Sequence, residues 1–464
     1  MEVGVFPPWV KKLSKKSKKT YADYGKKQSI ESIRTFDSII NFTIPDLAKD
    51  LIDLEKLKTK FCNEFKKVKK KSFDLFGFAD EKHFAEPKII YDVKHIPLKN
   101  LTVIAIDGSI ITRNFFNFDL SLLRGIGVIY NFNSSGIPEI KYHPKKGQEN
   151  YKISRILRNS HERETNSLVS VDRALMEISL AIDIISHSKT YENIPEKIDL
   201  LILDGSILTE PLNLAHSQYS HSILKNYHTL IKEYQKLYSI CEKKGILLVG
   251  VVKDTRSSTF IKFLLKNLPI LMKKYPELEG ITEINYRKLM KYFSDTGFFH
   301  RLLDVNERSC CFSINSPKKS WKPRQIELFE KNLKYETNII GDFDFFSCYL
   351  KPVKYDLPIR LEFHMKRSDL SINTINTRIQ QISSIILALS SKFEKFAIPI
   401  PQIEAHMRAK LSEEDLSVII NFLERFISEE LVNSRQRTPG SNNIDELILK
   451  NRLLLSKRRE RLPL

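Results

Sequence analysis

The stretch "VIAIDGS" (103–109) is an apolar run that ends in Asp-Gly-Ser, and "LILDGS" (201–206) has the same ending about a hundred residues later. An unbroken apolar run of this kind is typical of a buried strand. The Asp-Gly pair often makes a turn, because glycine adopts positive φ and aspartate can bond its own backbone. Open α/β sheets also place ligands at the carboxyl ends of neighbouring strands. Asp107 and Asp204 are therefore either turn residues or two parts of one site.

The charge of the chain is its clearest compositional feature. The 464 residues include 75 Lys and Arg against 56 Asp and Glu, which gives a net charge of +19. Such an excess favours a polyanionic partner, first nucleic acid and second an anionic membrane surface. A compositional bias of the genome towards lysine gives the same excess. A hydrophobic content of 42% is enough for a sizeable core.

Cysteine usage and hydropathy exclude several classes of protein. The five cysteines form no C-x-x-C pair, which excludes a zinc ribbon and a thioredoxin-type motif. No apolar run reaches the roughly 18 residues of a membrane span, and the basic start of the chain lacks the apolar core of a signal peptide. We therefore expect a soluble cytoplasmic protein without a membrane partner.

Shifts in composition and periodicity predict four regions. They are a basic flexible arm (1–28), a helical N-terminal extension (29–95), a larger α/β domain with insertions (96–410) and a helical C-terminal region with a basic tail (411–464). In the extension, apolar residues recur every three or four positions, as in an amphipathic helix, with a break or bend near Pro45. This extension either caps the α/β domain or holds DNA or a partner.

The α/β domain has a legible order of elements. We expect strands over 100–111, 125–132 and 138–143, a helix over 161–188, a strand over 199–207, a helix over 216–243 and a strand over 246–254. Later in the chain we expect strands over 343–351 and 359–365, and helices over 258–268, 369–392 and 413–430. With its first three strands antiparallel, this order matches the ribonuclease H-like fold, a mixed sheet flanked by helices. In that fold the first and fourth strands are neighbours, so Asp107 and Asp204 face each other.

A third carboxylate comes from the helix between these strands. The helical neighbours of Glu177 are mainly apolar, and a charge in such surroundings needs a partner or a metal. Clustered carboxylates cannot all stay ionised without a cation, and hard oxygen ligands select Mg²⁺ or Mn²⁺. Such ions activate water and stabilise charge during phosphodiester cleavage. An acidic metal site within a basic protein predicts a nuclease.

Three basic residues are candidates for phosphate contact. Lys253 lies at the end of the strand expected over 246–254 and Arg256 follows it. They either contact a phosphate or belong to an exposed helix-capping loop. Arg360 and Glu362 alternate with apolar residues along a strand, so the two share one face and form either an ion pair or part of a DNA contact.

Five stretches, taken in order, resemble the archaeal NurA nucleases over about residues 96–410. They are "VIAIDGS", "LILDGSI", "LLVGVVKDTRSS", "PIRLEF" and "PIPQIEAHMRA". The resemblance implies a ribonuclease H-like core, a homodimer and a requirement for Mn²⁺ or Mg²⁺. It also implies 5′-to-3′ resection of DNA ends in double-strand-break repair, together with the hexameric HerA helicase.

The resemblance also assigns the site. It implies catalytic and metal-binding roles for Asp107, Glu177, Asp204 and His406. Glu162 and Glu164 lie in the same segment as Glu177 and remain alternatives for the helix acid. The chain departs from the family at Ile398, where many members have a tyrosine.

The sequence leaves other functions open. It contains no G-x-x-x-x-G-K-[ST] motif, so a motor for movement along DNA has to come from a partner. Besides the exonuclease, which could also cut single strands internally, we consider a non-catalytic DNA-end adaptor for a helicase. A third possibility is a ribonuclease H-like enzyme that acts on RNA or junctions.

Overall fold

The computed structural model describes most of the chain between residues 44 and 437. The described residues are 44–72, 86–115, 118–145, 150–157, 162–187, 195, 197–208, 221–283, 292–314 and 342–437. The predicted basic arm and the basic tail lie outside them, as does the first part of the helix expected over 216–243.

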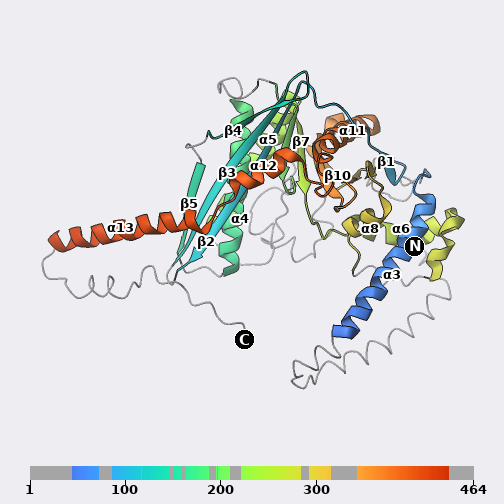
Figure 1. Ribbon diagram of the computed structural model, residues 1–464, viewed down its shortest axis with the longest axis horizontal. Helices are drawn as coiled ribbons and strands as arrows, with labels where there is room; N and C mark the ends of the chain where they lie inside the picture. Colours follow the sequence, from blue (N-terminus) through green and yellow to red (C-terminus); the bar gives the residue numbers. More distant parts are fainter. Residues whose placement is uncertain are drawn as a thin grey trace, which may run out of the picture.

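The described residues form an 11-stranded mixed sheet (Figure 1). Its strand order is β1-β8-β10-β11-β7-β6-β2-β3-β4, with β5 paired to β3 and β9 to β10. The strands are β1 (Ile90–Asp92), β2 (Leu101–Asn114), β3 (Phe118–Phe132), β4 (Pro138–His143), β5 (Asn150–Leu157), β6 (Leu200–Asp204), β7 (Leu247–Val252), β8 (Glu307–Ser309), β9 (Phe312–Ser313), β10 (Phe343–Lys351) and β11 (Ile359–Lys366).

The half of the sheet from β7 to β4 confirms the ribonuclease H-like prediction. β2, β3 and β4 are antiparallel neighbours, while β6 and β7 run parallel to β2. The expected strand over 125–132 starts earlier, at Phe118, and β5 was not predicted. β4 and β5 pair with different halves of β3, so β3 is long enough to carry two partners along one edge.

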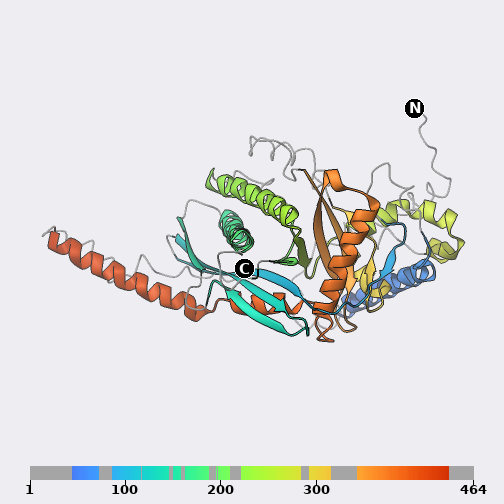
Figure 2. The ribbon, with the colours of Figure 1, turned by 90° about the horizontal axis from the view of Figure 1, so that it is seen from above.

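Helices cover both faces of the sheet. They are α3 (Ile44–Val68), α4 (Glu162–Ser186), α5 (His221–Lys244), α6 (Thr259–Lys274), η4 (Pro276–Glu283), α8 (Asp295–Leu302), η5 (Arg367–Asp369), α11 (Ile372–Ser390), α12 (Ile400–Ala409) and α13 (Glu413–Arg437). Figure 2 shows α4 and α5 on one side and α11 and α12 on the other. This arrangement explains the unbroken apolar runs, because strands buried on both faces need apolar residues at every position.

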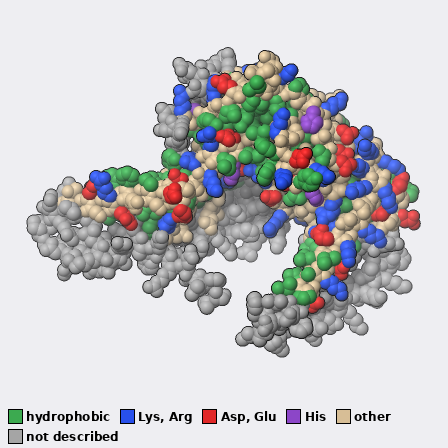
Figure 3. Space-filling view, viewed as in Figure 1, with side chains coloured by type: hydrophobic (Ala, Val, Ile, Leu, Met, Phe, Trp, Pro, Cys, Tyr) green, Lys and Arg blue, Asp and Glu red, His purple; other side chains and the backbone are tan. Residues whose placement is uncertain are grey.

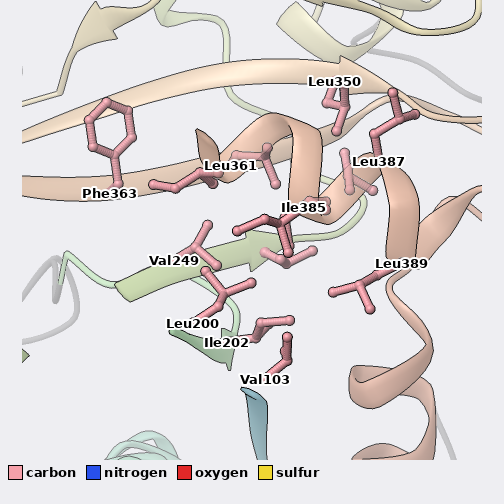
Figure 4. Close-up of a cluster of buried hydrophobic side chains, with 14 of the residues drawn as sticks. Val103, Leu200, Ile202, Val249, Leu350, Leu361, Phe363, Ile385, Leu387 and Leu389 are labelled. Carbon is pink, nitrogen blue, oxygen red and sulfur yellow. The ribbon is translucent and has the colours of Figure 1, made fainter. Parts of the chain in front are cut away.

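The two faces have separate cores. Val103 and Ala105 of β2 join the cluster beneath α11 and α12, part of which is drawn in Figure 4. Ile104 and Ile106 join the cluster beneath α4 and α5. This alternation along β2 means that Asp107 faces α12 and the next residue faces α4.

The helical extension and α13 lie at opposite ends of the molecule (Figure 1). α3 packs with α6, α8 and η4 in an aromatic-rich third core. α3 begins at Ile44, next to Pro45, and proline is favoured in the first turn of a helix. Residues 29–43 lie outside the described part. α13 projects away from the sheet, and hydrophobic side chains follow it in Figure 3. Among these, Val418, Phe422 and Phe426 are exposed.

Candidate active site

Asp107 lies inside β2 and not at a strand end. The pairing of β2 with β3 continues through Asp107 and on to the last residue of β2. The turn alternative is therefore wrong for the first stretch, and the strand expected over 100–111 continues through it. The second stretch does end its strand: β6 stops at Asp204, earlier than the expected 207, and Gly205 has a φ of 102°. The difference arises because β3 continues beside β2 after its other neighbour, β6, has ended.

Gly108 makes room for the side chain of Glu177. A β-carbon at position 108 would lie 2.7 Å from Oε1 of Glu177 and 2.9 Å from its Cγ. Any larger residue at this position would displace the carboxyl group of Glu177. Glycine therefore serves here to leave space for that group and not to make a turn.

Asp107 and Asp204 are neighbours across the sheet, as the sequence predicts. Ile106 of β2 pairs in parallel with Leu203 of β6, so the next residue on each strand is one of the two aspartates. Nδ1 of His406 lies 2.9 Å from Oδ2 of Asp107. One ligand atom from each of Asp107, Asp204 and His406 lies within 4.8 Å of the other two. The side chain of Asp107 is 3% exposed and that of His406 is 61% exposed, so the cluster is buried at its base and open at its top.

Two further side chains hold Asp204. Nε2 of Gln402 donates to Oδ1 at 2.7 Å, and Nζ of Lys253 donates to Oδ2 at 3.1 Å. Gln402 is not among the residues that the sequence predicts for the site. The spacing of four residues between Gln402 and His406 could have identified it, because this spacing puts both side chains on one face of a helix.

α12 is anchored to the strands that carry the site. Arg124 of β3 donates to the carbonyl oxygens of Ala409 and Lys410, at the end of α12. The backbone N–H of Leu411 donates to Oγ of Ser109 at 3.1 Å. A cationic side chain at a helix C-terminus satisfies free carbonyls and favours the helix dipole. The position of Gln402 and His406 therefore depends on β2 and β3.

Glu177 is a mostly buried acid, and one of its oxygens has no hydrogen-bond partner among the described residues. Its side chain is 12% exposed, and its nearest cation is Arg173, with Nη1 at 3.5 Å from Oε1. No hydrogen bond from the described residues reaches that Oε1. Burial raises the pKa of Glu177 to about 8, against the attraction of Arg173, and the charges of Asp107 and Asp204 raise it further. Burial, followed by the charge of Asp204, also raises the pKa of Asp107.

The donor set fits a hard divalent cation. Two carboxylates and an imidazole converge. The charge of Asp204 raises the pKa of Asp107, and the charges of both aspartates raise the pKa of Glu177. A cation would relieve that repulsion. Asp107, Asp204 and His406 offer the ligand atoms. Glu177 lies beside this set, and its Oε1 has no hydrogen-bond partner among the described residues although it is paired with the charge of Arg173.

The remaining candidates lie around this centre. Arg256 is exposed in the loop between β7 and α6. Arg360 pairs with Glu362, whose side chain is fully buried and also accepts from Oγ of Ser206 at 2.6 Å. The structure thus contains the ion pair that was one of the two alternatives for Arg360. Through Glu362 this pair is linked to Ser206, in the loop after Asp204. The roles of Lys253, Arg256 and Arg360 in DNA binding stay predictions.

The alternative helix acids lie far along α4 from Glu177. Glu162 and Glu164 belong to its first turn, which at 1.5 Å per residue is about 20 Å from Glu177. Ile398 comes just before α12 and is half-buried. In the part of the chain that the structure describes, no helix combines the length and apolar character that a membrane crossing requires.

Comparisons with known proteins identify the family. A family model described as the NurA domain matches residues 101–411. A crystal structure of NurA with manganese has 13% identity and a TM-score of 0.34, and the match covers 82% of this chain and 98% of that one. A structure of NurA bound to dAMP and manganese has 13% identity and a TM-score of 0.34, with coverage of 82% and 96%. The endonuclease V structure from Bacillus subtilis has 10% identity and a TM-score of 0.26, with coverage of 72% and 88%.

The search of curated proteins returned no match. The family model spans well over half of the chain and includes all four acidic and histidine residues of the site. The chain therefore belongs to the NurA family, a family of nuclease type.

Proposed function

We propose that this protein is a metal-dependent DNA nuclease that resects DNA ends in the 5′-to-3′ direction. The observation that carries the proposal is the cluster of Asp107, Asp204 and His406, buried at its base and open to solvent at His406. The net charge of +19 favours a nucleic acid as the substrate. The structures of NurA with manganese and with dAMP are consistent with the metal and with a deoxynucleotide.

Each side chain of the site has a distinct task in this proposal. Asp107 and Asp204 present oxygen ligands from the sheet, and His406 adds a nitrogen from α12. A bound Mn²⁺ or Mg²⁺ would supply water activation and neutralise the charge that builds up on the phosphate. Lys253, which is part-exposed beside Asp204, can turn its ammonium group towards a phosphate of the strand.

A substrate panel tests this function. The purified protein is incubated with duplex DNA, single-stranded DNA, RNA and an RNA–DNA hybrid, each labelled at the 5′ or the 3′ end, with Mn²⁺, Mg²⁺ or EDTA. We expect DNA products that shorten from the 5′ end, with Mn²⁺ or Mg²⁺ and not with EDTA. Cleavage of RNA or of the RNA–DNA hybrid alone would support the third possibility, a ribonuclease H-like enzyme that acts on RNA. DNA binding without cleavage under any metal condition would support the adaptor.

Lys253→Ala should weaken DNA binding. Loss of one phosphate contact lowers the affinity for all sequences and reduces the slope of log K against log salt by about one. The binding constant is measured by fluorescence anisotropy at several salt concentrations in EDTA. Lys236→Ala is the control, because this exposed lysine lies on α5, on the face of the sheet opposite to α12, and pairs with Glu233 of its own helix. An unchanged slope for Lys253→Ala would remove this residue from the DNA contact.

We also propose that the protein is a homodimer and works with a HerA-type hexameric ATPase. Family membership supports both partners, and the lack of a phosphate-loop motif means that movement along DNA needs an external motor. The exposed apolar side chains of α13 are a surface that a partner could cover. Light scattering after size-exclusion chromatography, with the protein alone and with a HerA-type ATPase, tests both associations.

A further inference from the structure

Gln402 is a buried polar side chain that packing alone does not explain. Its residue is 0% exposed, and its Oε1 has no hydrogen-bond partner among the described residues. A buried amide with one half unsatisfied reduces stability. An apolar residue of the same size would fill the space without that cost. The other half of the amide donates a hydrogen bond to Asp204 at 2.7 Å, and this bond distinguishes Gln402 from an apolar residue of the same size.

The two oxygens of Asp204 have different partners. Oδ1 accepts from Gln402, which is buried, while Oδ2 accepts from Lys253, which is part-exposed. A carboxylate can only accept hydrogen bonds, so the amide must turn its nitrogen towards Oδ1. This bond restrains the rotation of the carboxyl group and leaves Oδ2 facing Lys253, whose side chain is 26% exposed. One turn further along α12, His406 makes the corresponding contact with Asp107.

We propose that Gln402 is a positioning residue: it holds the carboxylate of Asp204 in the orientation that presents Oδ2 to a divalent cation. The inference rests on the metal site of the proposed function. Partners that orient a metal ligand typically change metal affinity by about 10- to 100-fold when they are removed. α12 then sets the direction of both aspartates, through Gln402 for one and His406 for the other.

Metal binding by Gln402→Met tests this role without using activity. Methionine has nearly the same shape and removes the donor. Mn²⁺ is titrated into metal-free protein, and the free ion is followed by electron paramagnetic resonance. We expect the dissociation constant of Gln402→Met to rise by about 10- to 100-fold, while its melting temperature in EDTA stays at or above that of the unchanged protein. If Gln402→Met does not fold, Gln402→Asn, which keeps the amide but withdraws it by one methylene group, is titrated instead.

Glu404→Met is the matched control. Glu404 lies on the same helix, but it accepts from Tyr142 and Arg408 and has no contact with the aspartates among the described hydrogen bonds. Its Mn²⁺ affinity should equal that of the unchanged protein. Equal weakening in Glu404→Met, or an affinity of Gln402→Met within about twofold of the unchanged protein, overturns the positioning role. Failure of the unchanged protein itself to bind Mn²⁺ overturns the proposed metal site, and the inference with it.

Discussion

Asp107→Asn should reduce metal-dependent DNA cleavage by at least about 100-fold. Asp107 is almost fully buried, accepts from its own next backbone N–H at 2.7 Å and lies 2.9 Å from His406. Asparagine keeps this shape but loses the negative charge and one of the two oxygens that can hold a cation. Asp204→Asn should have an effect of the same size. Initial rates are measured on end-labelled duplex DNA with saturating Mn²⁺.

Asp199→Asn is the control for both variants. This aspartate comes just before β6, at the opposite end of that strand from Asp204, where it accepts from the backbone N–H of Thr102 at 2.9 Å. It should keep the full rate. All three variants should bind DNA normally in EDTA, because the basic surface is unchanged. An Asp107→Asn protein that cleaves at the normal rate would show that the cluster is not the active site.

Glu177→Gln should lose activity while the metal-free protein becomes more stable. The pKa of Glu177 is raised from its ordinary value of 4.5 to about 8, chiefly by burial. Below pH 4.5 the carboxyl is neutral in both the folded and the unfolded chain, and it contributes no difference. Between pH 4.5 and 8 the unfolded chain releases the proton and the folded chain keeps it, so stability is lost as the pH rises. Glutamine is neutral throughout and avoids this loss.

Urea unfolding in EDTA at pH 5 and pH 8 measures the effect. We expect Glu177→Gln to exceed the unchanged protein in free energy of unfolding at pH 8 by up to about 5 kcal/mol, since the pKa rises from 4.5 to about 8 and one pKa unit corresponds to about 1.4 kcal/mol. At pH 5 the two proteins should be close. With Mn²⁺, cleavage by the variant should be at least about tenfold slower. A variant that is less stable than the unchanged protein at pH 8 would mean that Glu177 is held in its charged form by contacts other than those described.

The order and type of the central elements could be predicted because their signals are local. Runs such as "LLVGVV" (247–252) are apolar at every position, and only strands covered on both faces need that composition. The helical periodicity of α4 likewise predicted which residue could face the sheet. From the order of these elements, the adjacency of Asp107 and Asp204 followed without coordinates. The parallel pairing of β2 with β6 confirms it.

The contacts that complete the site depend on residues far apart in the chain. The local sequence around Asp107 and Gly108 resembles a turn, but the pairing with β3 keeps β2 extended, and the space at Gly108 is filled from α4. Gln402 reaches Asp204 across 198 residues, and His406 reaches Asp107 across 299. Composition and spacing describe the neighbours of a residue along the chain. Which carboxylate meets which donor is settled by the packing of α12 against β2 and β3, because only there do these side chains come within hydrogen-bond distance.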